Sequence, residues 1–368
     1  MLTLVLPVRG REEHTRRLIK HWSETSPRVT GGDQRTWPLI VVDGGNGSLR
    51  TEVERAGATY IHQPSQGMRH WMETNLATKI GLDAVRTPYA AWVHNDDFVL
   101  PYGTQHCLGQ LETHPSYIAW GGCVMAFDID TSAFPPVYGR LARLKLNFNH
   151  LCWAQDFDHD SAWERASAGM NNQAIQFAVY RTDALREVMT RSCSPHFSDG
   201  FVHEYFVHTF PLSLGKIKMD GTIASYLKQQ RASLRFEDPQ DWCLHLVRSA
   251  DYRADCDRLK ATLGPKWQEG SAKFASWLAG ALRSEYRFGK RLTAAKFRLL
   301  LERPRAAMWL LRMLYLIQNQ HELIFTDLER QGATASYRDI LRGEMKVIER
   351  ILGGPQPVHR DPFSPGYD

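Results

Sequence analysis

Residues 2–22 read LTLVLPVRGREEHTRRLIKHW. The apolar run at 2–8 is typical of a strand that is buried on both faces, and the segment 11–22 that follows it has the spacing of a helix. The same alternation continues along the chain, with strands expected at 38–45, 58–62 and 89–95 and a helix at 68–85. This repeated order of strand and helix predicts an α/β fold, with a mixed, mainly parallel sheet flanked by helices.

The rest of the chain divides into segments of different character. Further strands are expected at 117–127 and 172–180, whereas 128–170 has no periodicity and predicts an irregular insertion. Strand patterns cease before residue 238, where helical patterns begin. We therefore expect an α/β domain at 1–237, an α-helical C-terminal extension at 238–352 and a loose tail at 353–368.

The composition limits the class of protein. The 368 residues carry a formal net charge of +5, which is too small to indicate nucleic-acid binding by itself. No stretch approaches the ~20 apolar residues of a membrane-spanning helix. The six cysteines are scattered without the spacing of a metal site, which favours free thiols in a reducing compartment. We expect a cytoplasmic protein with no nucleic-acid partner.

Polar residues stand at the ends of three expected strands. Arg9 follows the first strand, Asp43 and Gly44 end the second, and the segment 94–97 (His-Asn-Asp-Asp) ends the strand at 89–95. Ligands of such sheets bind at the carboxyl ends of the strands, so these groups are expected to meet at one edge. Because adjacent carboxylates repel each other, those at 96 and 97 are either solvated in a loop, where one caps the next helix, or bound to a cation.

Three segments resemble, in order, the family 2 type of GT-A glycosyltransferases: LVLPVRGREE (4–13), IVVDGGNGS (40–48) and QGMRHWMETNLATKIGLDAVRTPYAAWVHNDDFVLP (66–101). Together, these segments extend the resemblance over roughly residues 2–104, and it continues more weakly over residues 172–230. The phosphate-binding patterns GxGxxG and GxxxxGK[ST] and the hydrolase pattern GxSxG do not occur in the sequence. Two positions depart from the family: Gly44 stands where a second Asp is usual, and His94 where the metal motif usually begins with Asp.

The resemblance implies a GT-A-like (Rossmann-like) fold and a nucleotide-sugar donor, a UDP-sugar in particular. The residues at matching donor-binding positions are Pro7, Val8, Arg9, Glu12, Asp43, Gly44, Gln66, Gly67, Asn75, Lys79, Asn95, Asp96, Asp97, Lys228 and Arg231. The last two lie in 226–234, which resembles a flexible segment that closes over the diphosphate. Three of these residues have alternative interpretations. Asp43 could instead form a turn, Asp97 could cap a helix, and Lys79 could lie on a solvated helix face.

A divalent cation, Mn²⁺ or Mg²⁺, is implied as the cofactor. Asp96 and His94 match the metal-binding positions, and an imidazole ligand suits Mn²⁺ better than Mg²⁺. Such a cation stabilises the charge on the departing diphosphate. His94 has an alternative role in packing, and DFDHD at 156–160 is an alternative metal motif that also fits a solvated loop.

An inverting transfer needs a base that takes the proton of the acceptor hydroxyl. GFVHEYF at 200–206 is the nearest match to the family segment that carries this base, and Glu204 occupies its position. The aromatic residues around Glu204 could raise its pKa toward a useful value. Asp199 is the second candidate for the base. Glu204 could instead be an ordinary residue on a helix surface.

Together, these observations lead us to expect a metal-assisted, inverting glycosyltransferase of surface polysaccharide or other glycoconjugate biosynthesis, with a glycan or lipid-linked acceptor beside 128–170. The basic helical stretch 277–312 either packs within the helical extension or a homo-oligomer, or makes a peripheral contact with the inner face of a membrane. The alternatives are a catalytically degenerate binding or scaffold subunit and, ranked lower, a sugar nucleotidyltransferase.

Overall fold

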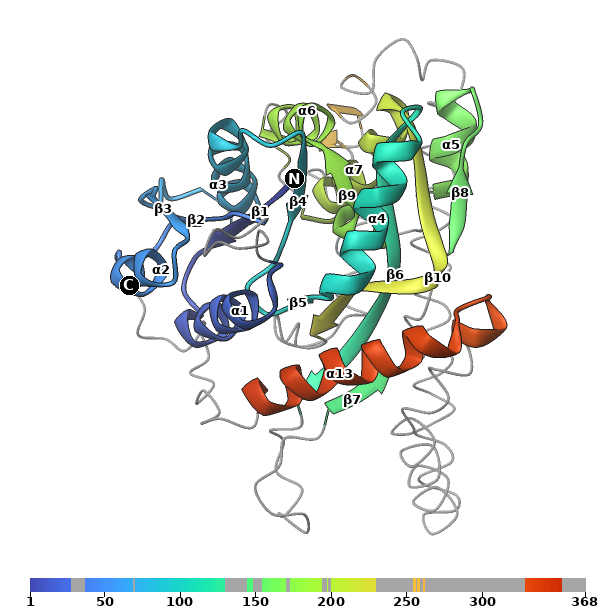
Figure 1. Ribbon diagram of the computed structural model, residues 1–368. Helices are drawn as coiled ribbons and strands as arrows, with labels where there is room; N and C mark the ends of the chain where they lie inside the picture. The colour runs from blue at the N-terminus through green and yellow to red at the C-terminus, as the bar shows by residue number, and fades with distance from the viewer. Residues whose placement is uncertain are drawn as a thin grey trace, which may run out of the picture.

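The computed structural model describes residues 1–27, 37–68, 70–129, 144–147, 154–169, 173–193, 197, 200–229, 254–255, 257–258, 261 and 328–352. Ten strands of these residues form one sheet, in which eight follow the order β3-β2-β1-β4-β9-β6-β10-β5 while β7 pairs with β6 and β8 with β10 (Figure 1). The expectations for 277–312 and for the tail at 353–368 lie outside the described residues.

The first four strands are all parallel to one another, and their positions confirm the expected alternation. The elements are β1 (Leu2–Val8), α1 (Glu12–Thr25), β2 (Leu39–Asp43), α2 (Arg50–Arg55), β3 (Thr59–His62), α3 (His70–Ala84) and β4 (Tyr89–Trp92). β1 lies between β2 and β4 and is parallel to both. All seven of its residues are buried, as the continuous apolar run predicts.

The second half makes the sheet mixed. Its elements are β5 (Phe98–Val99), α4 (Pro101–Thr113), β6 (Tyr117–Ile129), β7 (Leu144–Asn147), β8 (Gln155–Phe157), α5 (Ala162–Gly169), η2 (Gln173–Phe177), β9 (Val179–Arg181), α6 (Thr182–Cys193), α7 (Gly200–Leu214), β10 (Lys216–Gln229) and α13 (Ala335–Leu352). β9 is antiparallel to both β4 and β6, whereas the long strands β6 and β10 are parallel. The expected α/β class with a mixed, mainly parallel sheet and flanking helices is confirmed.

Three sequence-based expectations need correction. The segment 172–180 was expected to be a strand, but it begins with the 3₁₀ turn η2 and only its last residues join β9. The segment 226–234, expected to be flexible, starts inside β10, which extends to Gln229, and its residues 230–234 lie outside the described residues. The region 128–170 is not wholly irregular, because β7, β8 and α5 lie in it.

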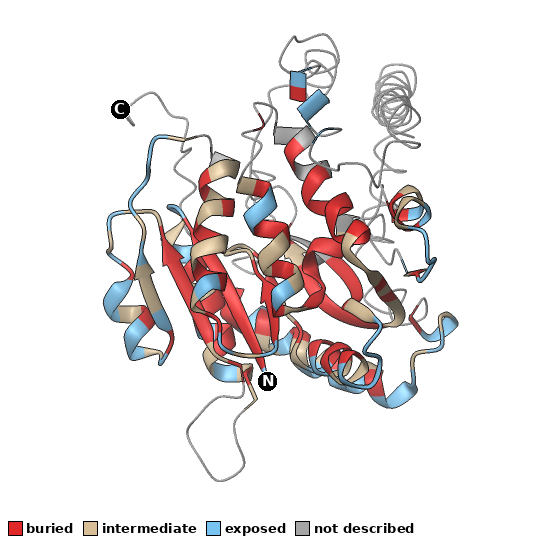
Figure 2. Ribbon diagram, turned by 90° about the horizontal axis from the view of Figure 1, so that it is seen from above, coloured by how far each residue is buried: buried red, intermediate tan, exposed pale blue. Residues whose placement is uncertain are grey.

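Helices cover both faces of the sheet. One apolar core lies between the sheet and α3, α6 and α7, and a second lies between the sheet and α1, α2 and α4. Figure 2 shows the buried strands in red beneath helices whose outward faces are exposed. α3 approaches the sheet closely at Gly81, where an added Cβ would lie 2.5 Å from Val5 Cγ1. The layers are therefore held at short range where α3 crosses β1 and β2.

The C-terminal helix α13 packs on the second half of the sheet. Its buried residues share an apolar core with Phe98, Leu100 and Leu227, and the helix also contacts α1 and α4. The Tyr337 hydroxyl accepts a hydrogen bond from Ala224 N at 2.8 Å and donates one to Ala224 O at 3.1 Å. α13 is thus joined to β10 by polar as well as apolar contacts.

Two further expectations concern the cysteines and the membrane. Cys107 and Cys193 are free thiols as expected, whereas Cys123 takes part in a disulfide, which the expectation of free thiols did not include. Within the described residues, no helix combines the length and the apolar character that crossing a bilayer requires.

The contact between α13 and α4 predicts a dependence of stability on pH. Burial raises the pKa of Glu344 to about 7, although Tyr102 N donates a hydrogen bond to its carboxylate at 2.8 Å. Because the pKa is higher in the folded than in the unfolded chain, the free energy of unfolding falls as the pH rises through 7. We expect Glu344→Gln to be more stable than wild type by on the order of 3 kcal/mol at pH 8 and by less than about 1 kcal/mol at pH 5. Urea unfolding at both pH values measures the difference, and an equal effect at both would contradict the assignment.

Candidate active site

The loop between β1 and α1 adopts an uncommon backbone conformation. Gly10 and Arg11 have φ values of 67° and 55°, and Arg11 has the one positive φ among the described non-glycine residues. A left-handed conformation is unfavourable for a residue with a Cβ and persists only when surrounding contacts enforce it. Gly44 N donates a hydrogen bond to Val8 O at 2.8 Å, which joins this loop to the turn after β2.

The loop after β4 gathers the predicted charged residues. Ligand atoms of His94, Asp96 and Asp97 all lie within 4.8 Å of one another. Arg11 Nη1 donates a hydrogen bond to Asp96 Oδ2 at 2.8 Å. Burial, followed by the negative charge of Asp97, raises the pKa of Asp96, and the positive charge of Arg11 opposes this rise. The structure therefore brings the expected carboxylates and histidine together, with Arg11 as the cation that faces Asp96.

Asp97 connects this loop to β10. Gln229 N donates a hydrogen bond to Asp97 Oδ1 at 2.7 Å, and the Tyr226 hydroxyl donates one to Asp97 Oδ2 at 3.1 Å. The Tyr226 hydroxyl also accepts a hydrogen bond from His94 N at 3.1 Å. The alternative of helix capping is wrong, because α4 begins after Leu100 without a side-chain cap. Asp97 instead holds the end of β10 beside the loop, a role that the sequence did not reveal.

The donor set at this site fits a hard divalent cation. Two carboxylates and one imidazole are ligands that suit Mn²⁺, and carboxylates alone suit Mg²⁺. The two carboxylates differ in their surroundings, because Asp97 is 2% exposed and bonded by β10 whereas Asp96 faces Arg11. Among the described residues, the chain offers this one group of three such side chains within reach of a single ion.

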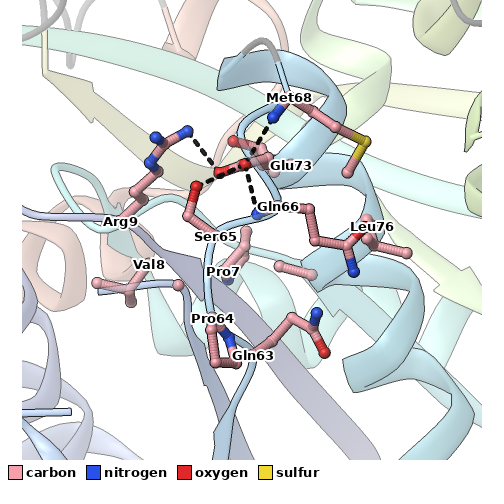
Figure 3. Close-up of a pocket in the computed structure, with 13 residues that line it drawn as sticks. Pro7, Val8, Arg9, Gln63, Pro64, Ser65, Gln66, Met68, Glu73 and Leu76 are labelled. Atoms are coloured by element: carbon pink, nitrogen blue, oxygen red, sulfur yellow. Dashed lines mark hydrogen bonds and ion pairs between the residues drawn. The ribbon is translucent and has the colours of Figure 1, made fainter. Parts of the chain in front are cut away.

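A shallow pocket, partly open to solvent, lies between the end of β1, the loop after β3 and α3 (Figure 3). Five predicted donor-binding residues line it: Pro7, Val8, Arg9, Gly44 and Gln66. The remaining lining residues are Gln63, Pro64, Ser65, Met68, Glu73, Thr74, Leu76 and Ala77. All three segments of the family resemblance therefore contribute to one cavity.

Glu73 organises this pocket and was missed by the sequence analysis. Its carboxylate accepts hydrogen bonds from Ser65 Oγ at 2.7 Å, Gln66 N at 2.9 Å and Met68 N at 3.0 Å, and it forms an ion pair with Arg9. Burial alone would raise the pKa of Glu73, but Ser65, Arg9 and the two backbone donors together lower it. A charged Glu73 thus fixes both the loop and the arginine at the pocket mouth.

Removing this carboxylate should loosen the pocket. We expect Glu73→Ala to lower the free energy of unfolding by about 2–3 kcal/mol, because three hydrogen-bond donors and one arginine lose their partner. Urea unfolding measures the change. The exposed pair of Glu187 with Arg191 on α6 supplies a matched control. Glu187→Ala should cost less than about 0.5 kcal/mol, and equal costs for both variants would contradict the role of Glu73.

Asp43 is buried at the end of β2 and has protein partners for both oxygens. Gly45 N donates a hydrogen bond to Asp43 Oδ1, and the Tyr60 hydroxyl donates one to Asp43 Oδ2, each at 2.7 Å. The first of these bonds closes the turn that the sequence predicts. Glu12, by contrast, accepts a hydrogen bond from the Ser48 hydroxyl at 2.6 Å at the surface, beside the same turn.

The other predicted site residues are spread over several elements. Lys79 pairs with Asp83 on its own helix at 2.7 Å, which is the expected alternative of a solvated helix face. Asn95 Nδ2 donates to Thr15 Oγ1 of α1 at 3.4 Å, and the Lys228 Nζ lies 5.5 Å from the centre of the Phe177 ring. Gly67 has a φ of 71°, a turn conformation that favours glycine.

Buried histidines of α7 lie behind the site. The Asn75 side chain contacts the His203 ring, and burial lowers the pKa of His203 to about 4 and that of His208 to about 3. Both imidazoles are therefore neutral at physiological pH. The predicted base Glu204 belongs to α7, but its side chain lies outside the described residues, as do Asp199 and Arg231.

The alternative metal motif at 156–160 lies elsewhere. Asp156 pairs with Lys218 at 2.7 Å and Asp160 with Lys216 at 3.1 Å, along the antiparallel pair of β8 and β10. These carboxylates bind lysines from the start of β10, whereas the loop after β4 contacts the end of that strand. The structure therefore favours 94–97 as the candidate metal site.

The fold and the site define an α/β protein with a pocket and, at the carboxyl ends of parallel strands, a cluster of three side chains that could hold a metal ion. No protein-family model and no curated protein matches the chain. Solved structures that are similar to it include S. aureus TarS, with a TM-score of 0.39 and 12% identity. This match covers 72% of this chain and 43% of the TarS chain. Residues 1–349 of TarS in complex with UDP give a TM-score of 0.40 and 12% identity over 96% of this chain and 89% of that one. Residues 1–349 of TarS in complex with UDP-GlcNAc give a TM-score of 0.39 and 14% identity over 73% of this chain and 72% of that one.

Proposed function

We propose that this chain is a glycosyltransferase of the GT-A type that moves a sugar from a nucleotide-sugar donor, a UDP-sugar, to a glycan or lipid-linked acceptor. The observation that carries the proposal is the loop between β1 and α1, because it joins the pocket to the carboxylate cluster. Arg9 lines the pocket and pairs with Glu73, and Arg11, two residues further on, pairs with Asp96. A nucleoside in the pocket would place its diphosphate beside both arginines and the cluster.

Each part of the site has a role in this reaction. The pocket holds the nucleoside, and Arg9 and Arg11 supply positive charge for the diphosphate. A divalent cation, Mn²⁺ or Mg²⁺, would be held by Asp96 and His94 and would stabilise the negative charge that develops on the departing diphosphate. Asp97 keeps the end of β10, with Lys228, next to this charge.

The acceptor side of the proposal depends on α7. For a transfer with inversion, Glu204 takes the proton from the acceptor hydroxyl as its oxygen attacks the anomeric carbon, and Asp199 is the alternative base. The neutral histidines on the inner side of α7 provide a weakly polar setting for that helix. Surface polysaccharide or another glycoconjugate is the proposed product, made at the inner face of a membrane where lipid-linked acceptors reside.

Thermal unfolding with a panel of nucleotides and nucleotide sugars, with and without Mn²⁺ or Mg²⁺, tests the proposal. A ligand at 100 times its dissociation constant should stabilise the folded chain by roughly 2.7 kcal/mol. We expect the largest shift with UDP or a UDP-sugar in the presence of metal. A shift that is independent of metal would contradict the role of the carboxylate cluster.

A binding or scaffold subunit is the second candidate, favoured by Gly44 and His94, which replace the acidic residues usual in the family. That protein would bind no nucleotide sugar, or would bind one without hydrolysing or transferring it. Donor hydrolysis that is lost in Glu204→Ala would exclude it. A sugar nucleotidyltransferase would instead release pyrophosphate from a nucleoside triphosphate and a sugar phosphate, so an assay for pyrophosphate with these substrates tests it.

A further inference from the structure

The side chain of Arg11 accounts for the unusual backbone of its loop. Arg11 has φ 55° and ψ 44°, a conformation that favours glycine or asparagine, and it directly precedes α1. The conformation places its guanidinium 2.8 Å from Asp96 Oδ2. The strained residue and the charged contact therefore belong to one arrangement, in which the chain brings a cation to this carboxylate.

The two carboxylates of the cluster have different kinds of partner. Asp97 receives hydrogen bonds from Gln229 N and the Tyr226 hydroxyl, both from β10. Asp96 receives its bond from Arg11, whose side chain remains 28% exposed, while that of Asp96 is 12% exposed. Arg11 can therefore leave the cluster toward solvent without opening the core. Asp97, by contrast, is held by two donors of the sheet and lies 3.5 Å from His94 Nδ1 within the loop.

We propose that Arg11 is a built-in counter-ion that competes with the divalent cation for Asp96 and is released when a nucleotide diphosphate binds. This inference rests on the proposed function and specifies the order of events at the same site. A metal ion and a guanidinium on one partly buried carboxylate would place like charges close together, which is unfavourable. Metal binding therefore requires Arg11 to move.

The donor supplies the alternative partner for Arg11. A guanidinium matches the oxygens of a phosphate in a two-pronged geometry, and Arg9, two residues earlier, already lines the pocket. A diphosphate would draw Arg11 from Asp96 and free that carboxylate for the metal. Nucleotide and metal would consequently bind with positive coupling, each raising the affinity for the other by the same factor.

The test is the affinity of the full chain for Mn²⁺, measured from the electron paramagnetic resonance signal of the free ion, alone and with UDP. Arg11→Asn removes the charge while keeping a residue that tolerates the left-handed conformation. We expect it to bind Mn²⁺ alone about tenfold more tightly than wild type, because the competing cation is gone. UDP should then enhance Mn²⁺ binding less than it does in wild type. Arg16→Asn, which removes an equal charge from α1 but leaves the pair of Arg11 with Asp96, should stay within about threefold of wild type.

The outcomes separate this inference from the proposed function. Mn²⁺ affinity in Arg11→Asn equal to or below that of wild type overturns the inference, even where UDP still promotes Mn²⁺ binding. Absence of Mn²⁺ binding in every variant, with UDP or without, contradicts the metal site of the proposed function and removes the inference with it. If Arg11→Asn does not fold, Arg11→Lys provides the comparison. A lysine ammonium keeps the charge but lacks the two parallel N–H donors of a guanidinium, so it should hold Asp96 less firmly. A Mn²⁺ affinity above that of wild type, by less than about tenfold, supports the inference, and an unchanged affinity overturns it.

Discussion

Asp96→Ala is expected to reduce sugar transfer at least about 100-fold and to abolish the metal-dependent shift in thermal stability with UDP. The reason is that Asp96 is the carboxylate that faces Arg11 rather than the sheet, so it is the one positioned to exchange a protein cation for a metal ion. Donor hydrolysis and transfer, both measured by release of UDP, check the first effect, and thermal unfolding checks the second.

Two further variants test whether the effect depends on the charge of Asp96. Asp96→Asn keeps an oxygen that accepts the hydrogen bond from Arg11, so its fold should be retained while activity falls to a similar extent. Asp183, which is 96% exposed and pairs with Arg186 on α6, provides the control. Asp183→Ala should leave transfer unchanged. Activity of Asp96→Asn close to wild type would show that the carboxylate charge is not used.

Gly103→Ala is expected to destabilise the folded chain by about 3 kcal/mol or more. Gly103 lies in the first part of α4, where an added Cβ would be 1.8 Å from the carbonyl oxygen of Ala224 and 2.6 Å from its carbonyl carbon. The obstacle is backbone, which cannot rotate away as a side chain can. The same residue of β10 is also bonded to Tyr337 of α13, so the strand has little freedom to move. Urea unfolding measures the effect.

Gly109 on the same helix provides the matched comparison for this substitution. No atom lies within 4 Å of the position where its Cβ would be. Gly109→Ala should stabilise the chain by about 0.5–1 kcal/mol, because alanine favours the helix more than glycine does. If Gly103→Ala unfolded at the same urea concentration as Gly109→Ala, the close approach of α4 to β10 would be wrong.

The first half of the fold could be predicted because its signals are local. β1 and β2 are continuous apolar runs followed by polar turns, and such runs are required of strands that are buried on both faces. The signals fail where tertiary contacts dominate. The apolar residues of η2 form a turn rather than a strand, and the Ile175 carbonyl accepts a hydrogen bond from the Tyr180 hydroxyl at 2.7 Å. The Asp-Gly pair at 220–221 suggests a break, yet β10 continues past it with a shift in register.

The candidate site shows the same division. His94 and Asp96 could be found because they follow a predicted strand, and parallel strands present their carboxyl ends at one edge. Glu73 and Tyr226 could not, because each acts through partners that are distant in sequence or belong to an irregular loop. Long-range hydrogen bonds of this kind leave no periodic pattern, so only the folded chain reveals them.

The bond between Asp97 and Gln229 joins residues that are 132 positions apart in sequence. Contacts of such separation form late, since the intervening chain must be ordered before the bond can compensate for the lost entropy. During synthesis, the strands β1 to β4 can pair as soon as they emerge, but the loop at 94–97 must wait for the end of β10. The carboxylate cluster is therefore completed by the last strand among the described residues, and we expect a nascent chain that stops before residue 226 to have the scaffold without the finished cluster.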